Sequence, residues 1–368
     1  MKYYIIAGEP SGDLHGAKIM QEIKNLDPNA EFRIWGGDKM LAQGGELVSH
    51  IRERAFMGIW EVVKNIRTIA RFMKLCKKDL LAYKADALIL VDYPGFNLKI
   101  AAFAKQHHIP VHFYIAPKVW AWNTKRVIKI KRDVDFLYSI LPFEPDFFQK
   151  HGIVTDYVGN PLMDQIESFA PNQSTIENLE NGKPIVALLP GSRKMELQNM
   201  MPIMQEMPKY FPEYRFIMAG SDAFSEEQLR VYCKNPEIEI LRGQTYEILS
   251  KAKAALVTSG TATLETALWS VPQVVCYRFS PISYFIVKPL MKIKYISLVN
   301  LILNKLAVVE LIQNKFTVEN TQKELHRILK NNTDILNDYN KLIEMVGKSG
   351  ASEKAAKLIV QRTMKKTN

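Results

Sequence analysis

The strongest constraint on the fold is a repeated alternation of short apolar runs with longer stretches of helical period. The run ALILVD, residues 87–92, is apolar without interruption up to its last residue, which is typical of a parallel strand buried on both faces. Parallel strands need crossover helices between them, so the alternation predicts an α/β fold with doubly wound parallel sheets. The cycle runs once to about residue 170 and restarts near residue 184 with PIVALLPGS.

Two domains follow from that restart. A chain of 368 residues is long enough for two separate cores. The polar segment 170–184 reads as a linker, so we expect an N-terminal domain over 1–170 and a C-terminal domain over 184–345. Both are expected to be Rossmann-like and to face a cleft. The helical, lysine-rich tail 346–368 is expected to be a C-terminal helix that packs back on the N-terminal domain.

The composition is that of a folded globular protein, but it does not identify a binding partner. An apolar content of 47% and a charged content of 24% exclude a disordered chain, and the three scattered cysteines show no metal spacing. We see no secretory signal and no membrane span, because lysines and a proline interrupt the most apolar stretch, 281–311. The net charge of +11 suits nucleic acid, an anionic membrane surface or a phosphorylated substrate.

The second half holds the first candidate anion site. Gly191, Ser192 and Arg193 directly follow the apolar run PIVALLP. Glycine lets a phosphate approach backbone N–H groups, the hydroxyl adds a donor, and the guanidinium matches phosphate oxygens with a planar fork. Because ligands bind beyond the carboxyl ends of parallel strands, we expect this loop to bind substrate.

A second candidate loop follows the apolar run AALV. Ser259, Gly260 and Thr261 can place N–H groups at a helix N-terminus, where the dipole favours a diphosphate. Glu265 lies one turn further on the same side and can accept hydrogen bonds from a ribose. The alternative is an ordinary N-cap with a solvated glutamate. Two such loops in one half favour a nucleotide diphosphate site.

The first half carries carboxylates at its strand ends. Asp92 ends a buried strand, where desolvation raises a carboxyl pKa and suits a general base, although a capping aspartate fits the same position. The opening loop GEPSGD has the glycines of a phosphate loop but no cation. Its Glu9 and Asp13 would repel a diphosphate but can bind sugar hydroxyls or support a catalytic base. We therefore place them with Asp92 as the candidate catalytic group, apart from the diphosphate loops, and leave capping of the following helix as an alternative for Asp13.

Metal and dinucleotide signals are weak in this sequence. The acids of DVD, residues 133–135, fall in an apolar run that reads as a strand, so we interpret them as structural. His108 and His112 are four residues apart on a predicted strand, too far to share a metal. Neither GxGxxG nor a Walker loop is present. We expect no metal site and no cofactor.

The stretch 56–84 is predicted to form a basic amphipathic helix. Apolar residues recur at helical spacing, and arginines and lysines interleave with them. Such a helix can rest on an anionic membrane surface, or it can pack on the core with a solvated basic side.

Taken in order, these motifs resemble those of the lipid-A-disaccharide synthase family, bacterial glycosyltransferases that join two acylated glucosamines. The resemblance lies in GEPSGD, VDYPGFN, YIAPKVWAW, LPFEPDFF, VGNPL, LLPGSR, TSGTATLE and YISLVN, which together span residues 8 to about 313. Each motif is weak alone, and the ordered set is highly specific. Around residues 299–304 the chain departs from the family pattern, with valine before the asparagine and LILN after it.

The resemblance implies a GT-B fold that binds the nucleotide sugar in its C-terminal half. It implies UDP-2,3-diacylglucosamine as donor, 2,3-diacylglucosamine 1-phosphate as acceptor, and an inverting transfer to the acceptor 6-hydroxyl that releases UDP. Asp92 would be the base and Arg193 a diphosphate contact, while Asn300, Glu310 and Gln313 would belong to the substrate site. It also implies a cytoplasmic enzyme, peripheral on the inner membrane, with no nucleic-acid partner and with a plausible homodimer.

Two other readings stay open at this point. A UDP-N-acetylglucosamine 2-epimerase, or another GT-B enzyme with a soluble substrate, would share the UDP loops but would not need the basic helix. A non-enzymatic, basic membrane- or RNA-binding protein would not depend on Asp92 or Arg193, and RNA binding would be strongly salt-dependent.

Overall fold

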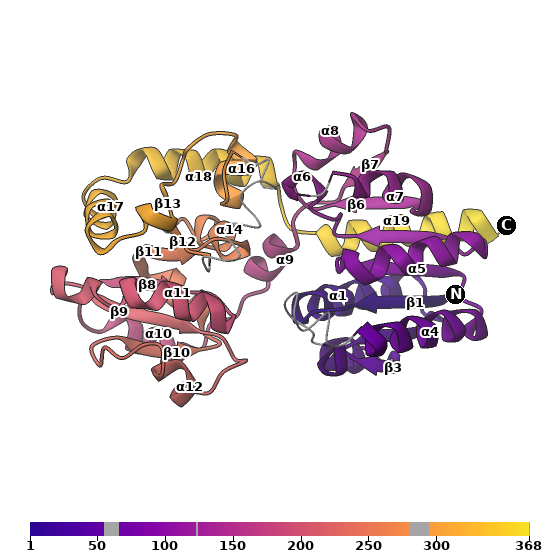
Figure 1. The fold of residues 1–368 in the computed structure, drawn as a ribbon, viewed down its shortest axis with the longest axis horizontal. Coiled ribbons are helices and arrows are strands. Elements are labelled where there is room, and N and C mark those ends of the chain that lie inside the picture. The colour runs from indigo at the N-terminus through magenta and orange to yellow at the C-terminus, as the bar shows by residue number, and fades with distance from the viewer. Residues whose placement is uncertain (55–65, 123, 280–293, 368) are drawn as a thin grey trace. The chain divides into compact units, whose positions relative to one another are not determined.

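The computed structural model describes residues 1–54, 66–122, 124–279 and 294–367. The chain divides into two compact units, one made of Met1–Asp164 with Lys348–Asn368 and the other of Gln165–Gly347. Each unit is an α/β domain built on its own parallel sheet (Figure 1). The α/β class predicted from the alternation of apolar runs is confirmed.

Within the described part of the first unit, seven parallel strands form a sheet in the order β3-β2-β1-β4-β5-β6-β7. The strands are β1 (Lys2–Ala7), β2 (Glu31–Gly36), β3 (Glu46–His50), β4 (Ala87–Val91), β5 (Val111–Tyr114), β6 (Phe136–Ser139) and β7 (Thr155–Tyr157). The helices are α1 (Pro10–Leu26), α2 (Asp38–Ala42), α4 (Ile66–Tyr83), α5 (Pro94–Gln106), α6 (Val119–Trp122), α7 (Arg126–Asp133), α8 (Glu144–Gln149), α9 (Pro161–Glu167) and α19 (Ala351–Thr367).

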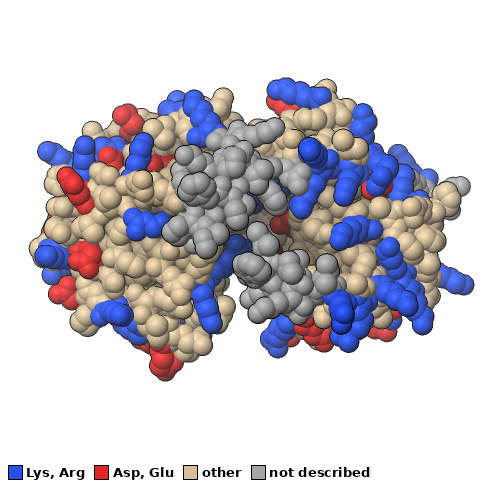
Figure 2. Space-filling view, in the orientation of Figure 1, with Lys and Arg blue, Asp and Glu red and all other residues tan. Residues whose placement is uncertain are grey.

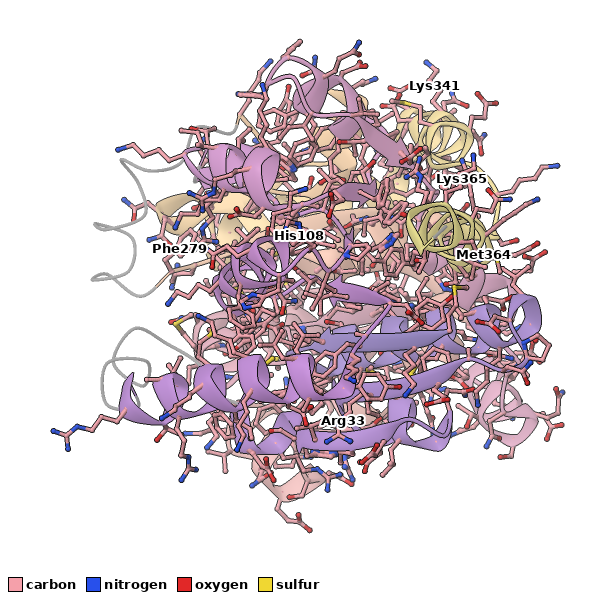
Figure 3. The ribbon with its side chains drawn as sticks, turned by 90° about the vertical axis from the view of Figure 1, so that its right-hand side faces the viewer. Arg33, His108, Phe279, Lys341, Met364 and Lys365 are labelled. Carbon is pink, nitrogen blue, oxygen red and sulfur yellow. The ribbon has the colours of Figure 1, made fainter. Side chains whose placement is uncertain are left out.

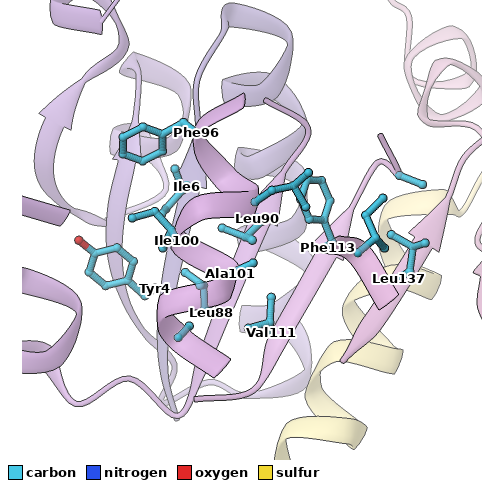
Figure 4. Close-up of a cluster of buried hydrophobic side chains, with 14 of the residues drawn as sticks. Tyr4, Ile6, Leu88, Leu90, Phe96, Ile100, Ala101, Val111, Phe113 and Leu137 are labelled. Carbon is cyan, nitrogen blue, oxygen red and sulfur yellow. The ribbon is translucent and has the colours of Figure 1, made fainter. Parts of the chain in front are cut away.

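Both faces of the first sheet are covered by helices. Tyr4 and Ile6 of β1 belong to a core shared with α4, α5 and α7, and Figure 4 shows part of this cluster between the sheet and α5. The alternate residues Tyr3 and Ile5 belong to a second core shared with α1 and α19. Continuous apolar strands are thus explained by burial on two sides.

Helix α4 is also tied to the sheet by a polar chain. The guanidinium of Arg33 on β2, labelled in Figure 3, donates from Nε and Nη2 to the carboxylate of Asp79 on α4 at 2.6–3.1 Å. The hydroxyl of Tyr4 donates to the same carboxylate at 2.8 Å and accepts from Nε1 of Trp35 at 2.6 Å. Through Asp79, these contacts attach the described part of the basic helix to strands β1 and β2. The predicted residues 56–65 of that helix lie outside the described residues.

Six parallel strands form the sheet of the second unit, over its described residues, in the order β10-β9-β8-β11-β12-β13. They are β8 (Ile185–Leu189), β9 (Arg215–Gly220), β10 (Glu239–Arg242), β11 (Ala252–Thr258), β12 (Gln273–Tyr277) and β13 (Glu310–Ile312). The helices are α10 (Gln173–Glu180), α11 (Lys194–Met204), α12 (Glu226–Arg230), α13 (Thr245–Lys251), α14 (Thr261–Leu268), α16 (Leu298–Leu303), α17 (Val318–Lys330) and α18 (Thr333–Val346).

Three elements differ from the sequence-based expectation. The polar segment predicted as a linker contains helix α10, because its Ile176 and Leu179 are buried in the second unit. Strands β3 and β13 were not predicted, since each is short and half-buried and so lacks a continuous apolar run. Helix α19, in contrast, lies in the first unit, the domain on which the tail 346–368 was expected to pack, and its Ala355 and Ile359 join the core beside α1.

Candidate active site

The predicted loops follow strands at the switch point of each sheet. In the first sheet the strand order reverses between β1 and β4, and in the second between β8 and β11. Loops that leave such a pair diverge to opposite faces and open the crevice in which doubly wound folds bind ligands. The loops at 8–13 and 92–93 follow β1 and β4, and the loops at 191–193 and 259–260 follow β8 and β11.

Asp92 lies at the carboxyl end of β4, and its backbone N–H donates to the carbonyl of Tyr114 on β5 at 3.0 Å. Its side chain is partly buried. Burial raises the pKa of this carboxyl, the nearby charge of Glu9 raises it further, and Lys118 acts in the opposite direction. The structure therefore brings Glu9, Asp92 and Lys118 together at one end of the sheet.

The opening loop and the Asp92 turn interlock through Gly8. A Cβ atom on Gly8 would lie 2.2 Å from Cγ of Tyr93, closer than any side-chain contact allows. The ring of Tyr93 in turn stacks on Phe96, with 5.9 Å between ring centroids. The glycine that resembled part of a phosphate loop is thus required for close packing of one loop on the other.

Glu9 and Asp13 occupy different environments. Glu9 is exposed at the N-terminus of α1 and makes no capping hydrogen bond with its side chain. Asp13 is only 4% exposed, and its carboxylate accepts hydrogen bonds from the backbone N–H groups of Gly37, Lys39 and Met40 at 2.6–3.1 Å. These contacts hold the start of α2 and use both carboxylate oxygens of Asp13, whose catalytic role stays a prediction.

Sequence reasoning missed two ionisable groups of the first unit: Lys118, whose charge acts on Asp92, and Glu144, on which Lys118 also acts. Lys118 follows β5 and could have been found by the strand-end rule that selected Asp92. Glu144, at the start of α8, is 1% exposed; it accepts from Nε1 of Trp120 at 3.0 Å and from the N–H of Leu141 at 3.1 Å. Burial raises the pKa of Glu144 to about 7, against the opposing effects of its hydrogen bonds and of Lys118. Nothing in its sequence position signals that burial.

The loop at 191–193, predicted to bind an anion, contacts a carboxylate of the chain itself. Gly191 has φ +106°, a conformation that favours glycine. The N–H groups of Ser192 and Arg193 both donate to Oε2 of Glu196, at 2.9 and 3.2 Å. The side chains of Ser192 and Arg193 are exposed. The two N–H donors predicted for a phosphate are therefore satisfied by Glu196 in this structure.

The loop at 259–261 leaves more open space. Gly260 has φ +144°, and a Cβ atom there would meet no described atom within 4 Å. The hydroxyl of Ser259 donates to the carbonyl of Ile296 at 2.9 Å, while Thr261 is exposed at the start of α14. Glu265 accepts from the hydroxyl of Tyr246 at 3.1 Å, and burial raises the pKa of its carboxyl. A half-buried acid one turn into α14 fits the predicted ribose contact.

Asn300 and Glu310 hold the segment 296–297, which contacts Ser259 of the 259–261 loop. Asn300 is fully buried, its amide donates to the carbonyl of Val308 and to Glu310, and its oxygen accepts from two backbone N–H groups, at 2.8–2.9 Å. Glu310 also accepts from the N–H groups of Ile296 and Ser297. Both residues hold the segment that Ser259 contacts, so in this structure they position the loop rather than face solvent.

Gln313 adopts a left-handed conformation, with φ +52°, directly after β13. Its side-chain oxygen accepts from the N–H of Phe279 at 2.7 Å, which fixes the chain that leaves β12. Tyr277 ends β12; burial raises the pKa of its hydroxyl, the charge of Glu196 raises it further, and Arg193 acts in the opposite direction. Residues predicted after β8, β11 and β13 therefore lie along one edge of the second sheet, together with Tyr277, which was not predicted.

Asp133, Asp135 and His112 all have structural partners. Asp133 is bonded to Arg132, and Asp135 accepts from the N–H of Val111 and from Lys105. His112 contacts Tyr138 and Thr363 inside the first unit. Over the described residues, no group of three or more histidine, cysteine, aspartate or glutamate side chains could hold a metal ion. No described helix is long and apolar enough to cross a membrane.

Two doubly wound parallel domains, each with polar loops at its switch point, are the architecture of the GT-B fold. The fold matches a putative UDP-N-acetylglucosamine 2-epimerase from Listeria monocytogenes, with a TM-score of 0.67, 12% identity and coverage of 99% of this chain and 97% of that one. The kitacinnamycin glycotransferase matches with a TM-score of 0.66 and 10% identity, over 98% of both chains.

Sequence comparison identifies the family within that class. The family model described as lipid-A-disaccharide synthetase matches residues 3–362, and the chain belongs to this family. A lipid-A-disaccharide synthase of Syntrophus aciditrophicus is 35% identical over 364 residues, which cover 96% of this chain and 95% of the relative. One from Trichlorobacter lovleyi is also 35% identical, over 97% of this chain and 96% of the relative. The family resemblance inferred from the ordered motifs is confirmed.

Proposed function

We propose that the chain is an inverting glycosyltransferase that joins UDP-2,3-diacylglucosamine to 2,3-diacylglucosamine 1-phosphate, giving a β-1′,6-linked disaccharide 1-phosphate and UDP. Family membership across residues 3–362 and the names of the curated relatives support this reaction over an epimerase or a non-enzymatic binding protein. The likeness to epimerases, at 12–14% identity, supports the fold alone.

The observation that carries the catalytic assignment is the position of Asp92. It ends β4 beside the switch point of the first sheet, and burial together with Glu9 raises its carboxyl pKa. An ordinary aspartate is a weak base at neutral pH, so a raised pKa improves proton transfer from a sugar hydroxyl. The acceptor 6-hydroxyl attacks the donor anomeric carbon and gives its proton to Asp92, while the bond from that carbon to the UDP oxygen breaks.

We propose that the second unit binds the UDP that leaves in the reaction. Arg193 and the N–H groups of the 259–261 loop would stabilise the negative charge that develops on the diphosphate, joined by the N–H groups of Ser192 and Arg193 once the diphosphate displaces Glu196. Glu265 would accept hydrogen bonds from the ribose, as its half-buried carboxylate on α14 allows. We assign Asn300, Glu310 and Gln313 to positioning these loops, and Glu9 to the acceptor sugar or to support of Asp92.

A basic and partly apolar face of the first unit suits an anionic lipid surface. Helices α4, α5 and α7 lie on one side of the sheet, and Figure 2 shows lysine and arginine side chains gathered over this unit. Exposed cations of this face include Arg67, Arg71, Lys74, Lys78, Lys129, Lys131 and Arg132, and Ile128 among them is 72% exposed. We propose peripheral binding to the cytoplasmic face of the inner membrane through this face. A homodimer and the absence of a nucleic-acid partner remain predictions.

The deciding test is turnover with defined lipids. The purified chain, with both acylated glucosamine substrates dispersed in detergent, should release UDP and form a disaccharide phosphate detectable by mass spectrometry. Asp92→Asn should lower kcat by about a hundredfold or more, a typical loss for a general base, with UDP affinity unchanged. Asp86→Asn is the matched control, because Asp86 precedes the same strand and binds only the N–H of Lys2 in the described contacts. No product from the unmodified chain would refute the proposal.

A further inference from the structure

The turn that carries Asp92 has an uncommon backbone. Asp92 and Tyr93 are consecutive and both left-handed, with φ +45° and +49°. Ile115, which follows the neighbouring strand β5, has φ +65° although its side chain is β-branched. Residues other than glycine avoid this region, and such conformations persist where the surrounding structure enforces them, often at functional sites. Something in the fold must therefore hold this turn.

Asn97, in the first turns of α5, supplies that restraint. It is fully buried, and its amide Nδ2 donates to the carbonyl of Asp92 at 2.7 Å. The same nitrogen lies 3.4 Å from the carbonyls of Ile6 on β1 and Val91 on β4. The amide thus connects the two strands at the switch point to the turn itself.

The oxygen of the same amide is left without a partner, which is unfavourable for stability. Among the described residues, the buried Oδ1 of Asn97 has no hydrogen-bond partner. An unsatisfied buried oxygen is unfavourable, and an apolar residue of similar size would avoid it. The side chain is therefore poorly explained by stability alone and well explained by the carbonyls that its nitrogen binds.

We propose that Asn97 is a positioning residue for the transfer reaction: its amide holds the left-handed turn and so aims the carboxylate of Asp92 into the site. This rests on the proposed function of Asp92 as the base. Asn97 itself touches backbone and not substrate. Its loss acts on kcat through the aim of Asp92, while UDP binding, assigned to the other unit, is unaffected.

The first test compares Asn97→Ala with a matched loss of buried hydrogen bonding in the same unit. Thr363→Val on α19 removes contacts to Ile359 and His112 that do not involve the Asp92 turn. Asn97→Ala should lower kcat at least thirtyfold and change the Kd for UDP less than twofold, by turnover assay and calorimetry. Thr363→Val should stay within threefold of the unmodified kcat. If Asn97→Ala also stays within threefold, Asn97 does not position the base.

The second test uses Asn97→Asp, which keeps the size of the side chain and guards against a misfolded alanine variant. When protonated, the introduced carboxyl group retains an O–H that can donate to the carbonyl of Asp92, and when ionised it repels that carbonyl. The kcat ratio of Asn97→Asp to Asn97→Ala should therefore rise severalfold as the pH falls from 8.5 to 6. A ratio independent of pH would overturn the positioning role. Full activity of Asp92→Asn would instead show that the base assignment itself has failed.

Discussion

Glu144 should make the stability of the first unit fall as the pH rises. Its carboxyl is 1% exposed, and burial raises its pKa from 4.5 to about 7. Between these two values the unfolded chain is ionised while the folded chain keeps the proton, so folding is favoured most below pH 4.5 and this benefit is lost as the pH rises through 7. At about 1.4 kcal/mol per pKa unit, the total change approaches about 3 kcal/mol.

His15 acts in the opposite direction over part of the same range. Burial lowers its pKa from 6.5 to about 4, so the unfolded chain takes up a proton first and stability falls as the pH drops through this window. His15 is only half-buried, and its contribution is correspondingly smaller. In the unmodified chain the two effects therefore offset each other between about pH 4.5 and 6.5.

The variant Glu144→Gln removes the titration of Glu144 and leaves that of His15, so comparing it with the unmodified chain isolates the effect of Glu144. The free energy of unfolding of the unmodified chain minus that of the variant should fall by about 3 kcal/mol between pH 4.5 and 8. Hydrogen exchange in peptides from β5 and β6 reports the first unit apart from the second. Trp120→Phe should move the window to higher pH, because the Trp120 hydrogen bond lowers the pKa of Glu144. A difference between chain and variant that stays constant within about 0.5 kcal/mol from pH 4.5 to 8 would refute this reasoning.

Three further predictions concern the loops. Gly8→Ala should destabilise the first unit by about 1–3 kcal/mol and impair turnover, because its Cβ would meet the ring of Tyr93 at 2.2 Å; thermal unfolding and the UDP-release assay check both. Asp164→Asn should cost about 1 kcal/mol by chemical denaturation, since the carboxylate accepts from three N–H groups at the start of α19, and an unchanged midpoint would argue against that anchor. Glu196→Ala should tighten UDP binding severalfold in calorimetry, because it frees the N–H groups of Ser192 and Arg193; weaker binding would show that Glu196 supports the site.

The order of apolar runs was sufficient to predict much of the fold. A strand buried on both faces needs an unbroken apolar run, and ALILVD, PIVALLP and AALV all became central strands of parallel sheets. The rule that ligands bind beyond carboxyl ends then selected Asp92, Arg193 and the loop at 259–261 from local sequence alone. Short, half-buried elements such as β3 and β13 lacked that signal and were missed.

What each polar side chain binds was decided by the tertiary structure. Asp13 accepts from backbone N–H groups of Gly37 and α2, and Asn300 binds backbone groups and Glu310, all partners that the fold brings near. Glu144 owes its raised pKa to burial that no local pattern reveals, and Asn97 faces the Asp92 carbonyl because β1, β4 and α5 meet at the switch point. Sequence determines which residues leave the end of a strand, because that depends on local periodicity. Partners and desolvation depend on contacts between segments far apart in the chain, so only the folded structure sets them.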